Sequence, residues 1–141
     1  MTPDGLLTTA IAPAFTYLPS KMDSPAARAE MLAIAMQESR CKHRAQIGGP
    51  AKGYWQFEQG GGVRCVLSHP SSQPYIRTVL EALDYATESD PAACYAAIQH
   101  NDVLAACFAR LLLWTLPTGL PGRYDAQGGW DTYVSAWRPG K

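Results

Sequence analysis

The residue best placed for catalysis in this sequence is Glu38. The segment before it predicts a helix whose apolar stripe ends at this glutamate. The stripe lies at i, i+3, i+4 and i+7, and consists of Met31, Ile34, Ala35 and Glu38. A carboxyl group at the end of such a stripe loses hydration, and desolvation favours its protonated form. A carboxylic acid that keeps its proton near neutral pH can donate it to a leaving oxygen, as glycosidic cleavage requires.

The same periodicity also fits a Glu38 that points into solvent from a fraying last turn. The segment that follows Glu38 favours the desolvated carboxyl over this alternative. Between Arg40 and Gly62 the helical periodicity stops, and glycines and Pro50 predict a loop region with at most one short hairpin. Tyr54 and Trp55 lie in this loop. Loops held on a rigid scaffold commonly carry functional sites.

The amino-terminal elements that would position Glu38 are predicted to be helical. The segment from Leu6 to Leu18 is apolar and predicts a short helix that Pro13 breaks. Ser24 is a typical N-cap, and Pro25 suits the first helical position. They predict a helix that runs to Glu38 or Ser39 and is buried on nearly all sides.

The second half of the chain also predicts helices, and no alternating strand pattern is present. Helices are expected from Pro74, from Pro91 to Ala97, and from Asn101 or Asp102 to about Trp114. The last of these is the predicted hydrophobic centre. A loop from Gly119 to Gly129 then precedes a final helix that contains Trp130, Tyr133, Val134 and Trp137, stopped by Pro139 and Gly140. The predicted class is mostly α, with residues 1–141 in one compact domain.

Composition excludes several kinds of function. Hydrophobic residues make up 47% of the 141 residues and charged residues 17%, so a packed core is expected. Twelve basic and twelve acidic residues give a net charge of zero, and no basic run suggests a nucleic-acid partner. The longest apolar run, Val103 to Ala109, is too short for membrane insertion. The amino terminus lacks the pattern of a signal peptide.

The four cysteines are expected to be free thiols, although sequence cannot choose among their three complete pairings. Cys94 and Cys107 lie in apolar helical patterns, where a free cysteine behaves as a small buried hydrophobe. Two further cysteines lie near histidines, as Cys41-Lys-His43 and Cys65-Val-Leu-Ser-His69. Their spacings are not those of a standard zinc module, so no metal ligands are predicted.

Two short motifs together resemble those of a known enzyme superfamily. Glu38-Ser39, a loop, and then Gly53-Tyr-Trp-Gln56 are similar to the signature of lytic transglycosylases and goose-type lysozymes. The resemblance covers Glu38 to Glu58, and the segment from Trp130 to Gly140 also looks like small phage-encoded members. It implies a lysozyme-like α fold and cleavage of the β-1,4 glycan strand of peptidoglycan between N-acetylmuramic acid and N-acetylglucosamine. No metal or organic cofactor is implied.

The resemblance also assigns roles to individual residues. Glu38 matches the catalytic acid. Ser39 matches the serine that helps to orient this acid, and it is also expected among the substrate-binding residues. Gln56 matches a glutamine that lines the sugar cleft; the alternative is a hydrogen bond within the loop. Tyr133 can stand in for the tyrosine of a late helix that approaches the catalytic glutamate, although the usual alanine-tyrosine-asparagine-alanine-glycine motif is absent.

Aromatic side chains are the other expected substrate-binding groups. Tyr54, Trp55 or Trp130 is expected to stack on sugar faces, and all three are counted among the substrate-binding residues. For Trp130 and Tyr133 the alternative is ordinary core packing.

Glu58 bears on the reaction type. Transglycosylases form an anhydro-sugar by internal attack and need one acid/base, whereas an inverting hydrolase needs a second carboxylate roughly 6.5–9.5 Å away. If residues 56–58 are extended, Gln56 and Glu58 point the same way and Phe57 faces the core. We expect hydrolysis with Glu58 as the base. The alternatives are a transglycosylase with Glu58 as a bystander, and a catalytically silent glycan-binding or virion module.

The resemblance and the missing signal peptide together suggest a phage protein. It would act on the cell wall from the virion, or leave the host cytoplasm through a membrane lesion as an endolysin. The expected partner is the glycan strand of peptidoglycan. A monomer is favoured.

Overall fold

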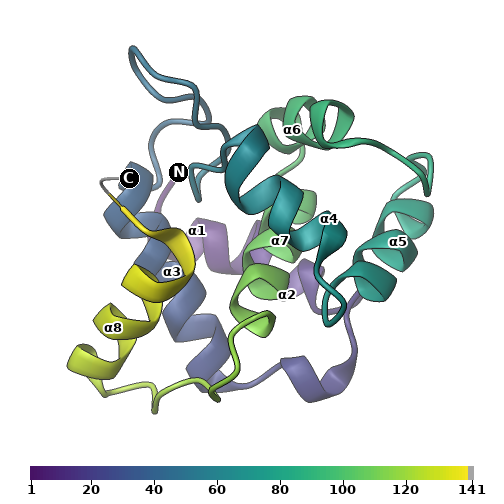
Figure 1. Cartoon of the computed structure of the whole chain (residues 1–141). Helices are drawn as coiled ribbons and strands as arrows, with labels where there is room; N and C mark the ends of the chain where they lie inside the picture. Colours follow the sequence, from purple (N-terminus) through teal and green to yellow (C-terminus); the bar gives the residue numbers. More distant parts are fainter. Residues whose placement is uncertain (140–141) are drawn as a thin grey trace.

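The computed structural model describes residues 1–139, and its helices surround one central apolar helix, α7 (Asp102–Trp114) (Figure 1). Asn101 caps α7 by accepting a hydrogen bond from the Leu104 N–H at 3.0 Å. Every residue from Leu104 to Leu113 is buried, which confirms that α7 is the hydrophobic centre. One cluster of buried apolar residues extends from Leu6 to Tyr133.

A single basic residue interrupts the apolar sequence of α7. Arg110 is only 5% exposed, and its Nε donates to the Met22 carbonyl oxygen at 2.8 Å. Desolvation lowers the Arg110 pKa to about 10. This hydrogen bond ties the central helix to the short 3₁₀ turn η2 (Ser20–Met22).

The amino-terminal segment is continuous through Pro13, so the predicted break is wrong. It consists of α1 (Pro3–Leu6), the π-helical turn η1 (Leu7–Ile11) and α2 (Ala12–Ala14). A proline has no N–H to donate and crowds the carbonyl four residues before it. The wider π turn directly before Pro13 accommodates both effects, and the chain stays helical.

Helix α3 (Pro25–Ser39) begins and ends as predicted. The Ser24 hydroxyl accepts a hydrogen bond from the Ala27 N–H at 3.0 Å, and Pro25 occupies the first position. Arg40 follows in the left-handed conformation, with φ of 54°, and its N–H bonds to the Met36 carbonyl. Glu38 therefore lies in the last turn of a helix that is capped at both ends.

The loop after α3 contains only isolated pairing. Ala45 and Lys52 form one antiparallel bridge, and Lys52 and Phe57 form another. Apart from these bridges, residues 1–139 contain no β structure, so the mostly α class is confirmed. None of the described helices has the length and apolarity to cross a membrane.

Helices on the far side of α7 complete the core. They are α4 (Arg64–Ser68), α5 (Gln73–Ala82) and α6 (Pro91–His100). Helix α4 and the π turn before it, η3 (Gln59–Val63), were not expected, because three consecutive glycines hid the helical pattern. The Asp90 carboxylate caps α6 by accepting a hydrogen bond from the Ala93 N–H at 2.8 Å.

Helix α8 (Ala126–Trp137) begins earlier than the sequence pattern predicted. The Asp125 carboxylate caps it by accepting from the Gly128 N–H at 2.9 Å, so Gly128 and Gly129 are helical and not loop residues. It ends with Arg138 in the left-handed conformation. Gly140, predicted to help stop this helix, lies outside the described residues.

All four cysteines are present as free thiols in the structure. Burial raises the pKa of Cys94 to about 11 and that of Cys107 to about 12, so neither is a ready nucleophile. Within residues 1–139 no group of three or more histidine, cysteine or acidic side chains could hold a metal ion.

Candidate active site

The site centres on a hydrogen bond between two helices that are far apart in sequence. The Tyr133 hydroxyl, from α8, donates to Oε2 of Glu38 at the end of α3. Tyr133 is buried and Glu38 is half-buried. The sequence had placed Tyr133 near the glutamate only through the resemblance. In the structure the two side chains are in contact.

The environment of Glu38 favours its protonated form. Desolvation is the largest influence and raises the pKa of the Glu38 carboxyl above 4.5. The hydrogen bond from Tyr133 lowers this pKa, and the negative charge of Glu58 raises it. The net direction is upward, which is the direction that a general acid requires.

A row of aromatic rings holds Tyr133 against Glu38. Phe57 packs edge-on against Phe108 of the central helix, with ring centroids 6.0 Å apart, and lies 5.8 Å from Trp137. Trp137 in turn lies 6.4 Å from Tyr133, which lies 5.3 Å from Trp130. These ring contacts connect Tyr133 to the central helix and so fix the position of its hydroxyl.

Ser39 is buried, with only 7% of its surface exposed, which leaves little of it accessible to a substrate. Its hydroxyl lies 2.7 Å from the Tyr54 carbonyl oxygen and 3.1 Å from that of Ala35, and it accepts from the Cys41 N–H at 3.2 Å. The expected substrate contact is wrong. Ser39 instead joins the end of α3 to the following loop, and so helps to fix the helix turn that carries Glu38.

Tyr54 and Trp55 are also buried, which contradicts the prediction that they stack on sugars. They are 2% and 0% exposed. The Trp55 indole N–H donates to the Met31 carbonyl of α3, and the Trp55 carbonyl accepts from the Trp137 indole, both at 2.8 Å. Sequence reasoning missed Trp137 as an anchor. The glycine-rich loop folds inward because Trp55 bridges α3 and α8.

Gln56 closes a tight turn instead of continuing an extended segment. Its φ is 55°, its N–H and its side-chain amide both donate to the Gly53 carbonyl at 3.0 Å, and its side chain is half-buried. The loop hydrogen bond that was the alternative is therefore present. Phe57 is buried as expected, at 1% exposure.

Glu58 follows the turn and is exposed to solvent. It lies close enough to Glu38 for its charge to raise the pKa of that acid. No hydrogen bond fixes its carboxylate among residues 1–139. The structure thus brings a second acid toward Glu38, although the extended geometry expected for residues 56–58 is absent.

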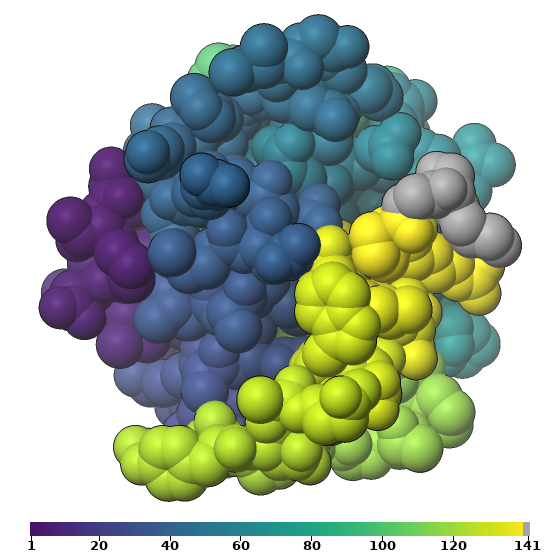
Figure 2. Space-filling view, turned by 90° about the vertical axis from the view of Figure 1, so that its left-hand side faces the viewer, coloured from purple at the N-terminus to yellow at the C-terminus, as the bar shows by residue number. Residues whose placement is uncertain are grey.

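Of the predicted stacking residues, Trp130 alone is accessible. It is 48% exposed on the first turns of α8. Figure 2 shows the face of the molecule where α3, in blue, lies beside the yellow-green start of α8. Trp130 and Tyr133 line a cavity of about 370 Å³ between these two helices.

Glu30 is the acid that sequence reasoning missed. It lines the same cavity, two turns before Glu38 on α3, and desolvation raises its pKa to about 7. Its position four residues before Ile34 places it beside the apolar stripe, and this spacing is the signal that could have identified it.

Comparisons of the chain with models of protein families, with curated proteins and with solved structures find no match.

Proposed function

We propose that this protein cleaves the glycan strand of peptidoglycan, with Glu38 as the general acid that protonates the leaving oxygen. The observation that carries the proposal is the half-buried Glu38 carboxyl, whose pKa is raised mainly by desolvation. It sits at a helix end and accepts a hydrogen bond from the hydroxyl of Tyr133, whose ring packs against the exposed Trp130. The resemblance of Glu38-Ser39 and Gly53-Tyr-Trp-Gln56 to lysozyme-like enzymes supports the substrate class.

The surrounding residues have positioning roles in this proposal. The Tyr133 hydroxyl directs one carboxyl oxygen of Glu38, and Ser39 and Trp55 fix the turn that carries it. Trp130 offers an accessible ring for stacking on a sugar. After protonation of the leaving oxygen, water attacks the sugar, and Glu58 accepts a proton from that water.

The central test replaces Glu38 with glutamine, which keeps the shape but cannot donate a carboxylic proton. Loss of general acid catalysis should lower the rate of cleavage of purified peptidoglycan about 10²–10⁴-fold. Glu81→Gln is the matched control, because Glu81 is an exposed glutamate on α5. Cleavage by Glu38→Gln at the wild-type rate would remove the basis of the proposal. Inactivity of the wild-type protein would favour a silent binding module.

A second candidate reaction is that of a lytic transglycosylase. The observation in its favour is the exposure of Glu58, because a carboxylate without fixed partners is a poor site for holding an attacking water. The proximity of Glu58 to Glu38 favours hydrolysis. Mass spectrometry of the products separates the two reactions, since hydrolysis leaves reducing ends and cyclisation leaves 1,6-anhydro ends.

A further inference from the structure

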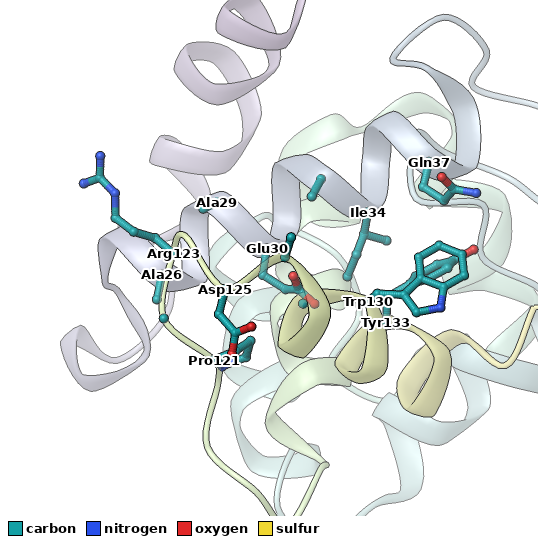
Figure 3. Close-up of a pocket in the computed structure, with 14 residues that line it drawn as sticks. Ala26, Ala29, Glu30, Ile34, Gln37, Pro121, Arg123, Asp125, Trp130 and Tyr133 are labelled. Atoms are coloured by element: carbon teal, nitrogen blue, oxygen red, sulfur yellow. The ribbon is translucent and has the colours of Figure 1, made fainter.

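The cavity between α3 and α8 is built around a carboxyl group without a partner. Glu30 is 7% exposed, and its Oε2 atom has no hydrogen-bond partner among the described residues. Figure 3 shows Glu30 turned from α3 toward the first turn of α8. A buried polar group without a partner is costly, so this carboxyl is a natural point of contact for a ligand.

The fold makes room for this carboxyl with a glycine. A Cβ atom at position 129 would lie 2.8 Å from Oε1 of Glu30, closer than carbon and oxygen can approach without a shift. Gly129 therefore lets the backbone of α8 pass next to Glu30. Apolar side chains such as Ile34 and Pro121 form much of the remaining wall.

The charges around the cavity favour a cation. Asp125 supplies a second carboxylate, although its Oδ1 already caps α8. Arg123 extends away from Glu30 in Figure 3, and its guanidinium lies over the Tyr124 ring, 4.6 Å from the centroid. An anion would face two carboxyl groups, and a purely apolar ligand would leave Glu30 without a partner.

We propose that this cavity binds a primary ammonium group on a short aliphatic chain, with the Glu30 carboxylate as its counter-ion. The aliphatic chain lies against the apolar wall. The ammonium group donates to Glu30, and the ring of Trp130, which lines the cavity and is 48% exposed, is a further contact for a cation.

This inference rests on the proposed function for the source of the ammonium group. The peptide stems of peptidoglycan contain a diamino acid, whose side-chain amine is free where the stem is not cross-linked. Tyr133 lines the cavity and also bonds to Glu38, so a stem held here would be attached to a glycan strand at the catalytic acid. Glu30 would thus make the enzyme prefer strands with free amines.

Binding is tested with a matched pair of small probes. Nα-acetyl-lysine methylamide has a free ammonium group, and its Nε-acetylated counterpart does not. In an NMR titration the first should shift resonances of Glu30, Ile34 and Gly129, and the second should bind about tenfold or more weakly. Glu30→Gln should weaken binding of the first probe by a similar factor, whereas the control Glu81→Gln should not.

The pH dependence of probe binding and a variant at a second position test the site without relying on Glu30→Gln. The titratable groups around the cavity are Glu30, Asp125, Arg123 and Tyr133. Binding of the ammonium probe should strengthen from pH 6 to pH 8 as Glu30 ionises, because its pKa is about 7. Ala33→Leu, which narrows the cavity, should also weaken binding. Equal binding of both probes, or no saturable shift, would overturn the site.

The substrate source is tested on peptidoglycan before and after chemical acetylation of its free amines. The wild-type protein should cleave the untreated material several-fold faster at low substrate concentration. Equal rates, together with loss of activity in Glu38→Gln, would overturn the stem-peptide assignment while leaving the proposed function intact. If Glu38→Gln stays active, the proposed function fails, and the probe titration still decides whether the ammonium site exists.

Discussion

Replacing Tyr133 with phenylalanine isolates the contact on which the geometry of the site depends. The ring is 4% exposed and lies between Trp130 and Trp137, so phenylalanine keeps the aromatic packing. The variant loses only the hydroxyl that donates to Glu38. Any change can therefore be attributed to the hydrogen bond and not to a cavity.

The size of the effect on stability follows from that bond. A hydrogen bond contributes about 0.5–1.5 kcal/mol between neutral groups and about 1.5–3 kcal/mol when one partner is charged. Because the Glu38 carboxyl is half-buried and its bond to Tyr133 is a single one, we expect a loss of about 1–2 kcal/mol in unfolding free energy. For a chain of this length the melting temperature should fall by roughly 3–8 °C.

The effect on the pH profile has a defined sign. Tyr133 lowers the pKa of Glu38, so its removal raises that pKa further. A general acid must be protonated, and activity is lost as pH rises through its pKa. The alkaline limb of kcat/KM should therefore move to higher pH in Tyr133→Phe.

The assay measures release of soluble fragments from purified peptidoglycan across a pH series, with thermal unfolding measured in parallel. Tyr85→Phe is the matched control, because its hydroxyl accepts from Asn101 at 3.2 Å and does not contact Glu38. It should leave the alkaline limb in place. An alkaline limb that stays fixed or moves to lower pH in Tyr133→Phe would refute the coupling between Tyr133 and the acid.

Three further predictions concern Glu58, Gly53 and Glu30. If Glu58 activates water, the wild-type protein should release products with reducing ends, and Glu58→Gln should lower kcat substantially with little change in KM. An unchanged kcat in Glu58→Gln would leave Glu58 without a catalytic role. Gly53→Ala should lower the free energy of unfolding by about 2 kcal/mol or more. The φ angle of Gly53 is 76°, and the new Cβ would lie 2.8 Å from Cγ2 of Ile98. An unchanged midpoint of denaturant unfolding would contradict this. Burial raises the Glu30 pKa from 4.5 to about 7, so its contribution to stability is complete below about pH 4.5 and is lost as pH rises through 7. Glu30→Gln should therefore be more stable than wild type by up to about 3 kcal/mol at pH 8, and equal stability at that pH would show that Glu30 is not held in an unfavourable site.

Local signals in the sequence were enough to predict α3, which carries Glu38, and the central helix α7. Ser24 and Pro25 start α3, and Asn101 starts α7, because caps act through hydrogen bonds to backbone groups two or three residues away. The position of Glu38 at the end of an apolar stripe follows from the 3.6-residue period alone. The class and the central role of α7 are settled at this level.

Local signals failed where distant residues compensate for a locally unfavourable pattern. Glycines at positions 128 and 129 appeared to be a loop, but the Asp125 cap and the close approach of Glu30 make them the first turn of α8. Tyr54 and Trp55 appeared accessible because glycines surround them. Their burial depends on Trp55 bonding to α3 and α8 at once, which no local pattern can indicate.

The sequence by itself determined that an acid ends an apolar helix, since periodicity and capping are properties of neighbouring residues. The tertiary structure alone decided what surrounds that acid. Tyr133 reaches Glu38 across 95 residues because aromatic packing from Phe57 to Trp137 fixes α8 beside α3. The close approach of α8 at Gly129 also buries Glu30, and desolvation raises the pKa of its carboxyl to about 7. Desolvation depends on every element around a group, and so it is decided only when the chain has folded.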